Sequence, residues 1–412
     1  ASLGATALAG VGIANEVIFF MISIFSAVSV GGTVLVSHAI GARDPARANR
    51  LARQSVVWGL IIATPLTLLG IVLAEPLIGI FGADREVTAE GTTYLRITSA
   101  GMVVMVLIFV LGAVLKGAGD SRTPLYASFI ANIVNGIASY VLIFGEAGLP
   151  RLEVAGSAWG TVIGRGTGAA ILLWFLLSGR RRISLAGRHG WRPTRNVAAE
   201  LAQIGVPTAI ERVVTNVGIT TMVLIVATIG TAALAAQQVL FTTFAVALLP
   251  GIGFATAATA LVGQSLGARD IAAAREAARI AMRWAMASML VAAAVFILLA
   301  RPIMSAFTDD AAVIDHGDGA LIAMGLTLPV WVFQWVYGGG LRALGDDRTP
   351  MLTNIAATWI GVALAWVGVT WLDGGLTMVW AAQVVTCPIM LLTLPVFRRK
   401  LARREAELAV DP

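Results

Sequence analysis

The sequence has little charge and almost no cysteine or histidine, and these shortages exclude several classes of protein. Only 13% of its 412 residues are charged, roughly half the share of soluble domains, and no stretch is long and polar enough to form a soluble domain. The single Cys387 forms no disulfide within the chain, and the three histidines lie far apart without partners at ligand spacing. We therefore expect neither a disulfide scaffold nor a metal site.

Apolar residues fill the chain instead, at 58% of the sequence. Runs of about 20 or more apolar residues recur along it, long enough for helices to cross a bilayer. Eleven such segments can be marked, at about 5–39, 49–81, 87–115, 124–145, 154–178, 198–229, 231–265, 273–307, 319–341, 350–371 and 375–397. The sequence predicts an all-α polytopic membrane protein embedded in a lipid bilayer. Its net charge of +6 does not indicate nucleic acid, because the basic residues gather between the apolar runs.

Four stretches of the sequence occur twice at one ungapped offset. The motif Gly-Asp-x-Arg-Thr-Pro lies within "GAGDSRTP" at 117–124 and within "ALGDDRTP" at 343–350, 226 residues apart (343 less 117). The same offset relates the "GARD" motifs at 41–44 and 267–270, "LGATALAG" (3–10) to "IGTAALAA" (229–236), and residues 73–84 to 299–310. Four matches in one register indicate an internal duplication.

The offset also predicts how the helices divide between the two copies. The segment 198–229 precedes the second copy, and its counterpart in the first copy would lie before residue 3. We therefore expect a first helix upstream of Ala1, and twelve helices in two parallel-repeat six-helix bundles. The expected divisions are an N-terminal lobe (1–178), a cytoplasmic linker (179–197), a C-terminal lobe (198–397) and a cytoplasmic tail (398–412).

Most basic residues fall on one side of the predicted membrane. When alternate connections are assigned to opposite sides, 23 of the 29 Lys and Arg residues share a side with both GARD motifs and both repeated loops. The positive-inside rule makes this the cytoplasmic side. We expect a multi-pass protein of the cell membrane, with both termini of the full-length protein in the cytoplasm.

The two Gly-Asp-x-Arg-Thr-Pro loops suit the connection between two antiparallel helices. Gly119 and Gly345 suit a left-handed residue that ends a helix, while Thr123 and Pro124 suit the cap and first turn of the next helix. A rigid hairpin is one interpretation. A second is a cytoplasmic gate made of the charged residues Asp120, Arg122, Asp346 and Arg348.

Charged side chains at membrane depth are costly and are candidate functional residues for that reason. Glu211 follows Pro207 in the segment 198–229, where a buried carboxylate can exchange a proton or hold a cation. Glu16 lies in the segment 5–39 and Arg165 in 154–178. These two could pair across a cavity, or Glu16 could take part in ion coupling.

Uncharged polar and aromatic residues inside the apolar segments are predicted to line a cavity. Asn132, Asn135 and Ser139 share one helix face, because they are three and four positions apart. Hydrogen bonding between helices is the alternative for this stripe. The predicted substrate cavity comprises Asn132, Arg165, Asn216, Gln237, Gln238, Trp331 and Gln334.

Together these motifs resemble the multidrug and toxic compound extrusion (MATE) family. The resemblance rests on "LGATALAG", the two GARD motifs, the two Gly-Asp-x-Arg-Thr-Pro loops and "GVPTAIE" at 205–211, and it covers residues 3 to about 397. It implies a secondary active antiporter, not an enzyme, that exports cationic amphipathic compounds in exchange for Na⁺ or H⁺ by alternating access. It implies small organic cations as partners, a monomer, and no cofactor beyond the coupling ion.

The resemblance assigns ion coupling to a few positions. The carboxylate that the family carries in the helix after the linker falls on Glu211, and an Asn and a Thr of its N-lobe cation site fall on Asn135 and Thr161. Where many members carry an Asp one turn after that Asn, this chain has Ser139. The Asp of the family's first helix has no counterpart in the chain, and Glu16 is predicted to substitute for part of that site.

Three alternatives stay open on the sequence alone. A lipid-linked-precursor flippase of the same superfamily would use cationic residues for a pyrophosphate headgroup, for which Arg165 and Arg212 are candidates. A major-facilitator transporter also has two six-helix repeats, but it does not explain the second duplicated motif. A membrane-embedded enzyme would need clustered His, Asp, Glu, Ser or Lys near one face, and the sequence offers no such cluster.

Overall fold

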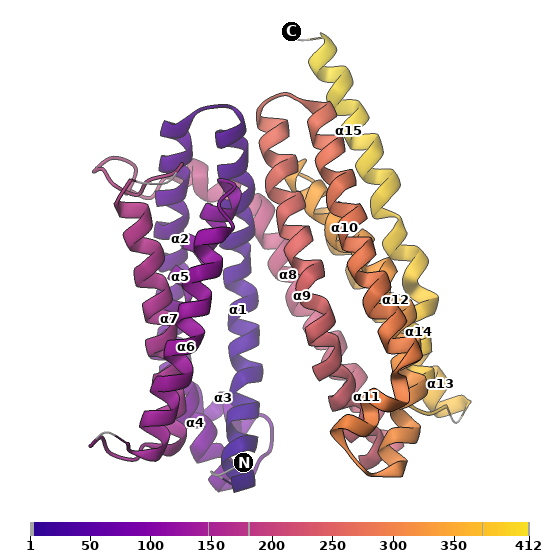
Figure 1. Ribbon diagram of the computed structural model, residues 1–412. Helices are drawn as coiled ribbons and strands as arrows, with labels where there is room; N and C mark the ends of the chain where they lie inside the picture. Colours follow the sequence, from indigo (N-terminus) through magenta and orange to yellow (C-terminus); the bar gives the residue numbers. More distant parts are fainter. Residues whose placement is uncertain (1–3, 147, 180–181, 373, 411–412) are drawn as a thin grey trace. The chain divides into compact units, whose positions relative to one another are not determined.

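Helices make up nearly all of the chain in the computed structural model (Figure 1). The structure describes residues 4–146, 148–179, 182–372 and 374–410, so Arg180 and Arg181 of the predicted linker and the outermost residues of the first lobe and the tail lie outside it. Over those ranges no strand occurs, which confirms the all-α class. The helices are α1 (Gly4–Gly41), α2 (Pro45–Val72), α3 (Ala74–Gly79), α4 (Arg85–Ala100), α5 (Met102–Gly117), α6 (Arg122–Phe144), α7 (Glu153–Leu177), α8 (Arg195–Ile229), α9 (Thr231–Gly267), α10 (Ile271–Leu298), α11 (Ala300–Phe307), α12 (Ala311–Ala343), α13 (Arg348–Trp371), α14 (Leu376–Leu391) and α15 (Thr393–Val410).

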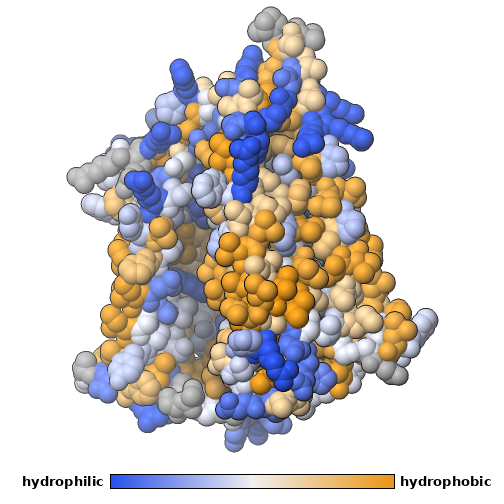
Figure 2. Space-filling model, turned by 45° about the vertical axis from the view of Figure 1, so that its right-hand side comes forward, coloured by the Kyte–Doolittle hydropathy of each residue, from blue (hydrophilic) through white to orange (hydrophobic). Residues whose placement is uncertain are grey.

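Ten of the helices in the described ranges are long and apolar enough to cross a membrane, and the bent pair α4 and α5 raises the number to eleven. This pair was predicted as one segment and bends by 52° at Gly101, where an added Cβ would lie 2.4 Å from Val162. In the right-hand part of Figure 2, apolar residues gather at mid-height, with hydrophilic residues above and below them. Large apolar side chains such as Trp284, Val291 and Leu298 of α10 are left exposed, as expected for helices that face lipid. The polytopic membrane architecture is therefore confirmed.

The duplication extends from the motifs to the boundaries of the helices. Helices α2 (45–72) and α10 (271–298) begin and end 226 residues apart (271 less 45). The same spacing relates the start of α4 and the end of α5 (85–117) to the start and end of α12 (311–343). The starts of α6 and α13, at 122 and 348, keep it as well. Two copies of one helix plan are thus built from sequences that share only a few motifs.

The GARD turns are alike in backbone and in capping. Asp44 accepts a hydrogen bond from Arg47 N at 2.9 Å, and Asp270 accepts one from Ala273 N at 2.8 Å. Just before each cap, Arg43 and Arg269 adopt φ values of 56° and 57°, a left-handed conformation that is costly for a side-chain-bearing residue. Each turn thus ends one helix and caps the next in the same way.

The Gly-Asp-x-Arg-Thr-Pro loops repeat a second capping arrangement. Gly119 and Gly345 have φ of 86° and 78°, as predicted for residues that end a helix. The predicted cap was the threonine, but the structure assigns that role to the aspartates. Asp120 accepts hydrogen bonds from Thr123 N (3.0 Å) and Oγ1 (2.6 Å), and Asp346 accepts them from Thr349 N (3.1 Å) and Oγ1 (2.7 Å). The threonine is the donor because an ionised carboxylate can only accept hydrogen bonds, and the aspartate therefore satisfies a free N–H at the start of the helix.

The chain forms two compact units, Ala1–Ala209 and Ile210–Pro412, divided within α8. The connection after α7 packs on the first unit, where Ile183 and Leu185 are buried. Arg53 Nε of α2 donates to the carbonyl of Leu185 at 3.3 Å, and Gln54 Nε2 donates to two further carbonyls of the connection at 2.7 Å. These contacts make the described part of the connection an element of unit 1.

The chain end predicted as a tail is a helix packed on unit 2. Phe397 and Leu401 of α15 are buried against Leu341 of α12 and Ile271 of α10. Leucine and phenylalanine at a spacing of four residues fall on one face of a helix, which explains the packing. This packing brings Lys400 to the loop between α12 and α13.

Candidate functional site

Glu211 of α8 lies at the centre of a charged cluster in unit 2. Its side chain is 9% exposed, and its Oε2 accepts a hydrogen bond from Arg342 Nη2 of α12 at 2.6 Å. Its Oε1 accepts one from Asn354 Nδ2 of α13 at 2.9 Å. Both carboxylate oxygens are therefore held by donors from two neighbouring helices, as a buried carboxylate requires.

Glu211 lies nearer the repeated loop than its place in an apolar segment suggests. Arg342 occupies the last turn of α12, which ends at Ala343, and Asn354 lies in the second turn of α13, which begins at Arg348. Glu211 is thus level with the helix ends that flank the loop 344–347. The helix α8 has 35 residues, and the sequence does not show how far it is shifted along its axis relative to α12 and α13. The level of Glu211 along the bundle therefore could not be predicted.

Two adjacent aspartates in this loop have opposite surroundings. Asp346 binds Lys400 Nζ at 2.9 Å and accepts hydrogen bonds from Thr349 N and Oγ1. Burial alone would raise the pKa of Asp346, but hydrogen bonds from Lys400 and Thr349 outweigh burial and hold the pKa below its ordinary value. The Asp346 carboxyl is therefore ionised under ordinary conditions.

Asp347, by contrast, is 4% exposed, and neither of its carboxyl oxygens has a hydrogen-bond partner in the described part of the chain. Burial raises the pKa of Asp347 to about 7, against the opposing effect of Arg342 and with a smaller contribution from Asp346 and Glu211. Arg342 also has a spare group, because its Nε is buried without an acceptor. Sequence reasoning did not name Arg342, Asn354 or Asp347 as site residues. The available signal was that they replace Lys116, Ser128 and Ser121 of the first copy at the same offset.

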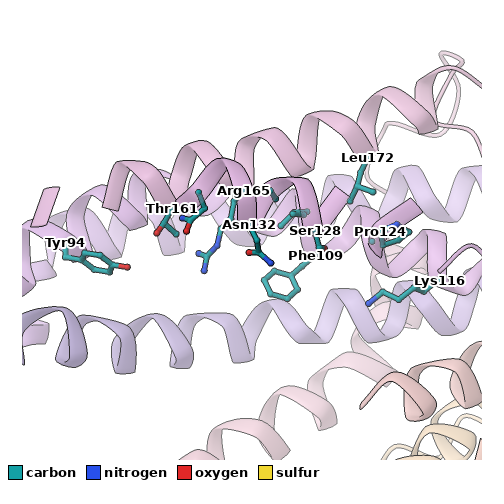
Figure 3. Close-up of a pocket in the computed structure, with 13 residues that line it drawn as sticks. Tyr94, Phe109, Lys116, Pro124, Ser128, Asn132, Thr161, Arg165 and Leu172 are labelled. Atoms are coloured by element: carbon teal, nitrogen blue, oxygen red, sulfur yellow. The ribbon is translucent and has the colours of Figure 1, made fainter. Parts of the chain in front are cut away.

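Unit 1 holds a cavity of about 450 Å³ between α4, α5, α6 and α7. It brings together four of the residues predicted from the sequence, Asn132 and Asn135 of α6 with Thr161 and Arg165 of α7. Figure 3 shows Arg165 and Asn132 side by side in the middle of this cavity, with Tyr94 near one end and Lys116 near the other. Two of them, Asn132 and Arg165, were predicted for a substrate cavity and the other two for an ion site, and in the structure all four line one cavity.

The cavity of unit 1 is basic. Lys116 and Arg165 line it, and no carboxylate occurs among its described lining residues. Arg165 Nη1 lies 2.8 Å from the Met105 sulfur, a weak acceptor. The pairing considered for Glu16 and Arg165 is not formed among the described residues, and Glu16 is exposed on α1.

The other predicted site residues lie outside this lining. Ser139 packs where α6 crosses α7, so that a Cβ on Gly160 would lie 2.1 Å from its Oγ. In unit 2, Gln237 accepts a hydrogen bond from Trp380 Nε1 at 2.9 Å. Gln334 links α12 to α13 by donating to the Pro350 carbonyl at 2.7 Å and accepting from Thr353 at 3.0 Å.

The remaining predicted residues are more open. Gln238 is exposed and Asn216 is half-buried. Trp331 packs edge-on against Phe244 and Trp335, with ring centroids 5.5 and 5.7 Å apart. Arg122 and Arg348, predicted for a gate, are both exposed beside their loops. Across the residues that the structure describes, no three His, Cys, Asp or Glu side chains form a group that could hold a metal ion.

Comparisons with known proteins agree on one family. The sequence model of the MatE family matches residues 1–141 and 207–367. A "Multidrug resistance protein NorM" from Burkholderia vietnamiensis is 32% identical over 372 residues, which cover 87% of this chain and 78% of the relative. A "Probable multidrug resistance protein NorM" from Thermotoga maritima is 28% identical over 355 residues, which cover 86% of this chain and 76% of the relative.

Solved structures share the fold. A multidrug resistance MATE family transporter of the MOP superfamily, in an outward-facing conformation, has a TM-score of 0.91 at 21% identity and covers 98% of this chain and 90% of its own. A MOP superfamily transporter from Pyrococcus furiosus, described as having a binding pocket of reverse polarity that suggests a different function, has the same TM-score at 20% identity and the same coverage.

Proposed function

Because the chain belongs to the MatE family of multidrug efflux transporters, whose members are transporters and not enzymes, we propose that it is a secondary active antiporter. It exports cationic amphipathic compounds in exchange for an ion, by alternating access, and acts as a monomer. The membrane is the cell membrane, and the helix ends that carry the repeated loops face the cytoplasm. The basic residues near those loops support this orientation.

The coupling ion proposed is a proton, carried by Glu211 of unit 2. The observation that supports this is the pair of donors on the Glu211 carboxylate, Arg342 Nη2 at 2.6 Å and Asn354 Nδ2 at 2.9 Å. A hard cation such as Na⁺ needs several oxygen ligands around it, whereas the groups facing Glu211 are N–H donors. A proton needs only the carboxylate, and its arrival breaks the ion pair with Arg342.

The proposed substrate site is the cavity of unit 1. Asn132, Asn135 and Thr161 offer hydrogen bonds there, while Tyr94 and Phe109 offer aromatic surface, a combination that suits amphipathic compounds. The aromatic cluster of Phe244, Trp331 and Trp335 in unit 2 offers a second surface, suited to cations.

The basic lining of unit 1 favours a second candidate, a flippase for a lipid-linked precursor. Lys116 and Arg165 line the cavity without a carboxylate among its described lining residues, and such cations suit a phosphate headgroup. The substitution Arg165→Gln separates the two candidates. An exporter of cations gains affinity for a cationic dye when a repelling charge is removed, whereas a flippase loses binding of a phosphate-bearing lipid.

The test of the proposed function is efflux of a cationic dye from proteoliposomes under imposed ion gradients. We expect a pH gradient to drive efflux and a Na⁺ gradient without a pH difference to leave the dye inside. Arg301→Gln, at an exposed arginine of α11, serves as the matched control for loss of one positive charge. Efflux driven by Na⁺ alone would overturn the assignment of the proton, and dye retention under both gradients would overturn the function itself.

A further inference from the structure

The carboxyl group of Asp347 is not used by the function proposed above, and its surroundings are unusual. It is almost fully buried, yet both of its oxygens lack a donor. A charged carboxylate in such a place is strongly disfavoured, because burial removes its water and nothing replaces that water. The adjacent Asp346 shows what an ionised carboxylate receives in this loop, namely Lys400 and two donors of Thr349.

Arg342 binds Glu211 and also acts electrostatically on Asp347. Its Nη2 donates a hydrogen bond to Glu211, while its Nε is buried and has no acceptor among the described residues. Both carboxyl oxygens of Asp347 lack a hydrogen-bond donor over the ranges that the structure describes. Arg342 is the cation that most strongly lowers the pKa of Asp347. One arginine thus faces two carboxyl groups, of which only one is bound.

We propose that Asp347 is a second proton-binding carboxyl of unit 2, and that it exchanges Arg342 with Glu211 as its proton leaves and returns. While Asp347 is neutral, Arg342 binds Glu211. When the Asp347 O–H bond breaks and the proton passes to water at the loop end of the bundle, the carboxylate attracts the free Nε of Arg342. Glu211 then loses a donor and becomes the next acceptor for a proton, with no change of covalent structure elsewhere.

The charged groups near Asp347 belong to its own loop and to the helices α8, α12, α13 and α15. Arg342 of α12 favours its ionised form, while Asp346 of the same loop and Glu211 of α8 disfavour it. Lys400 of α15 is occupied by Asp346. Arg212 of α8 lies within electrostatic range of Arg342 and Glu211, and Arg348 of α13 is exposed. The unpaired Asp347 carboxyl is therefore suited to bind a proton. Burial raises the pKa of Asp347 to about 7, so the group can bind and release a proton near neutral pH.

The inference rests on the proposed proton coupling, but its test does not require transport. Infrared difference spectroscopy of the purified full-length protein detects the C=O stretch of a protonated, buried carboxyl group. We expect the parent to show such a band that disappears as the pH rises through about 7, and Asp347→Asn to lack it. Asp347→Ser, which gives the motif the sequence Gly-Asp-Ser-Arg-Thr-Pro of the first copy, is the second variant should the asparagine fold poorly. Asp309→Asn, at an exposed carboxylate, should keep the band.

Two further variants test the coupling through Arg342. Glu211→Gln removes a like charge and releases Arg342, so the Asp347 band should disappear at lower pH than in the parent. Arg342→Gln removes the nearby cation, so the band should persist to higher pH. A titrating band that is the same in Asp347→Asn and in the parent would overturn the proposal. If the band behaves as expected but no gradient drives efflux, the proposed function fails while the proton site stands.

Discussion

The two copies of the repeated hairpin share their capping but differ in their charges. In both, an aspartate caps the second helix through a threonine, and a glycine with positive φ ends the first. At the same offset, Lys116, Ser121 and Ser128 of unit 1 correspond to Arg342, Asp347 and Asn354 of unit 2. The duplication has kept the backbone plan, while in unit 2 the residues at two of these positions, Arg342 and Asn354, bind the carboxylate of Glu211. A repeated motif therefore marks a repeated scaffold, and the chemistry is found where the copies differ.

The largest difference between the units should be in stability. Glu211→Ala leaves Arg342 buried without its carboxylate, which should lower the free energy of unfolding by about 3 kcal/mol. Lys116→Met at the corresponding position of unit 1 should change it by less than about 0.5 kcal/mol, because Lys116 has no carboxylate partner in the described part of the chain. Thermal unfolding of the detergent-purified protein measures both.

The double variant Glu211→Ala with Arg342→Met serves as the control for this prediction, since removing both charges should recover most of the loss. If Glu211→Ala and Lys116→Met proved equally mild, the ion pair would contribute nothing and the contrast between the units would disappear.

The two capping aspartates should differ by a smaller amount. Asp120→Ala should cost about 1 kcal/mol through loss of the cap, and Asp346→Ala should cost up to about 1 kcal/mol more, because Lys400 loses its partner. The pKa of Asp346 is held below its ordinary value of 3.8, so its contribution is present above that pH and is lost as the pH falls through the folded-state pKa.

Unfolding measured from neutral to acidic pH checks this prediction, with Asp309→Ala as the exposed control. The difference between Asp346→Ala and the parent should shrink in acid. A difference that grows as the pH falls would contradict the assigned role of Lys400.

The smallest effects should be equal in the two units. Arg43 and Arg269 share a left-handed backbone, in which glycine avoids a side-chain clash. Arg43→Gly and Arg269→Gly should each raise the free energy of unfolding by about 0.5 kcal/mol. Unfolding curves of the two variants measure this. If only one substitution stabilised the protein, the GARD turns would not be equivalent.

Much of the fold could be predicted from the sequence, because the length of each apolar run and the spacing of the repeated motifs can be read from it directly. The offset between the motifs recurs in the ends of α2 and α10, and the left-handed glycines lie where the loops required them. The bend at Gly101 was missed, because it depends on the contact with Val162 of another helix.

The candidate site was predictable only in part. Asn132, Asn135, Thr161 and Arg165 come together because helix periodicity places the members of each pair on one face. The partners of Glu211 lie 131 and 143 positions away, and nothing local indicates that they meet. Ser139 is a similar case. Helix periodicity predicted which face of α6 it occupies, but not that it packs on Gly160 of α7.

The central claim is that unit 2 carries the coupling proton on Glu211, and efflux driven by a pH gradient tests it most directly. Proteoliposomes with the parent, with Glu211→Gln and with the exposed control Asp309→Asn would be loaded with a cationic dye and given the same gradient. The account predicts that Glu211→Gln releases dye no faster than empty vesicles, while Asp309→Asn matches the parent. Efflux by Glu211→Gln at the parent's rate would contradict it.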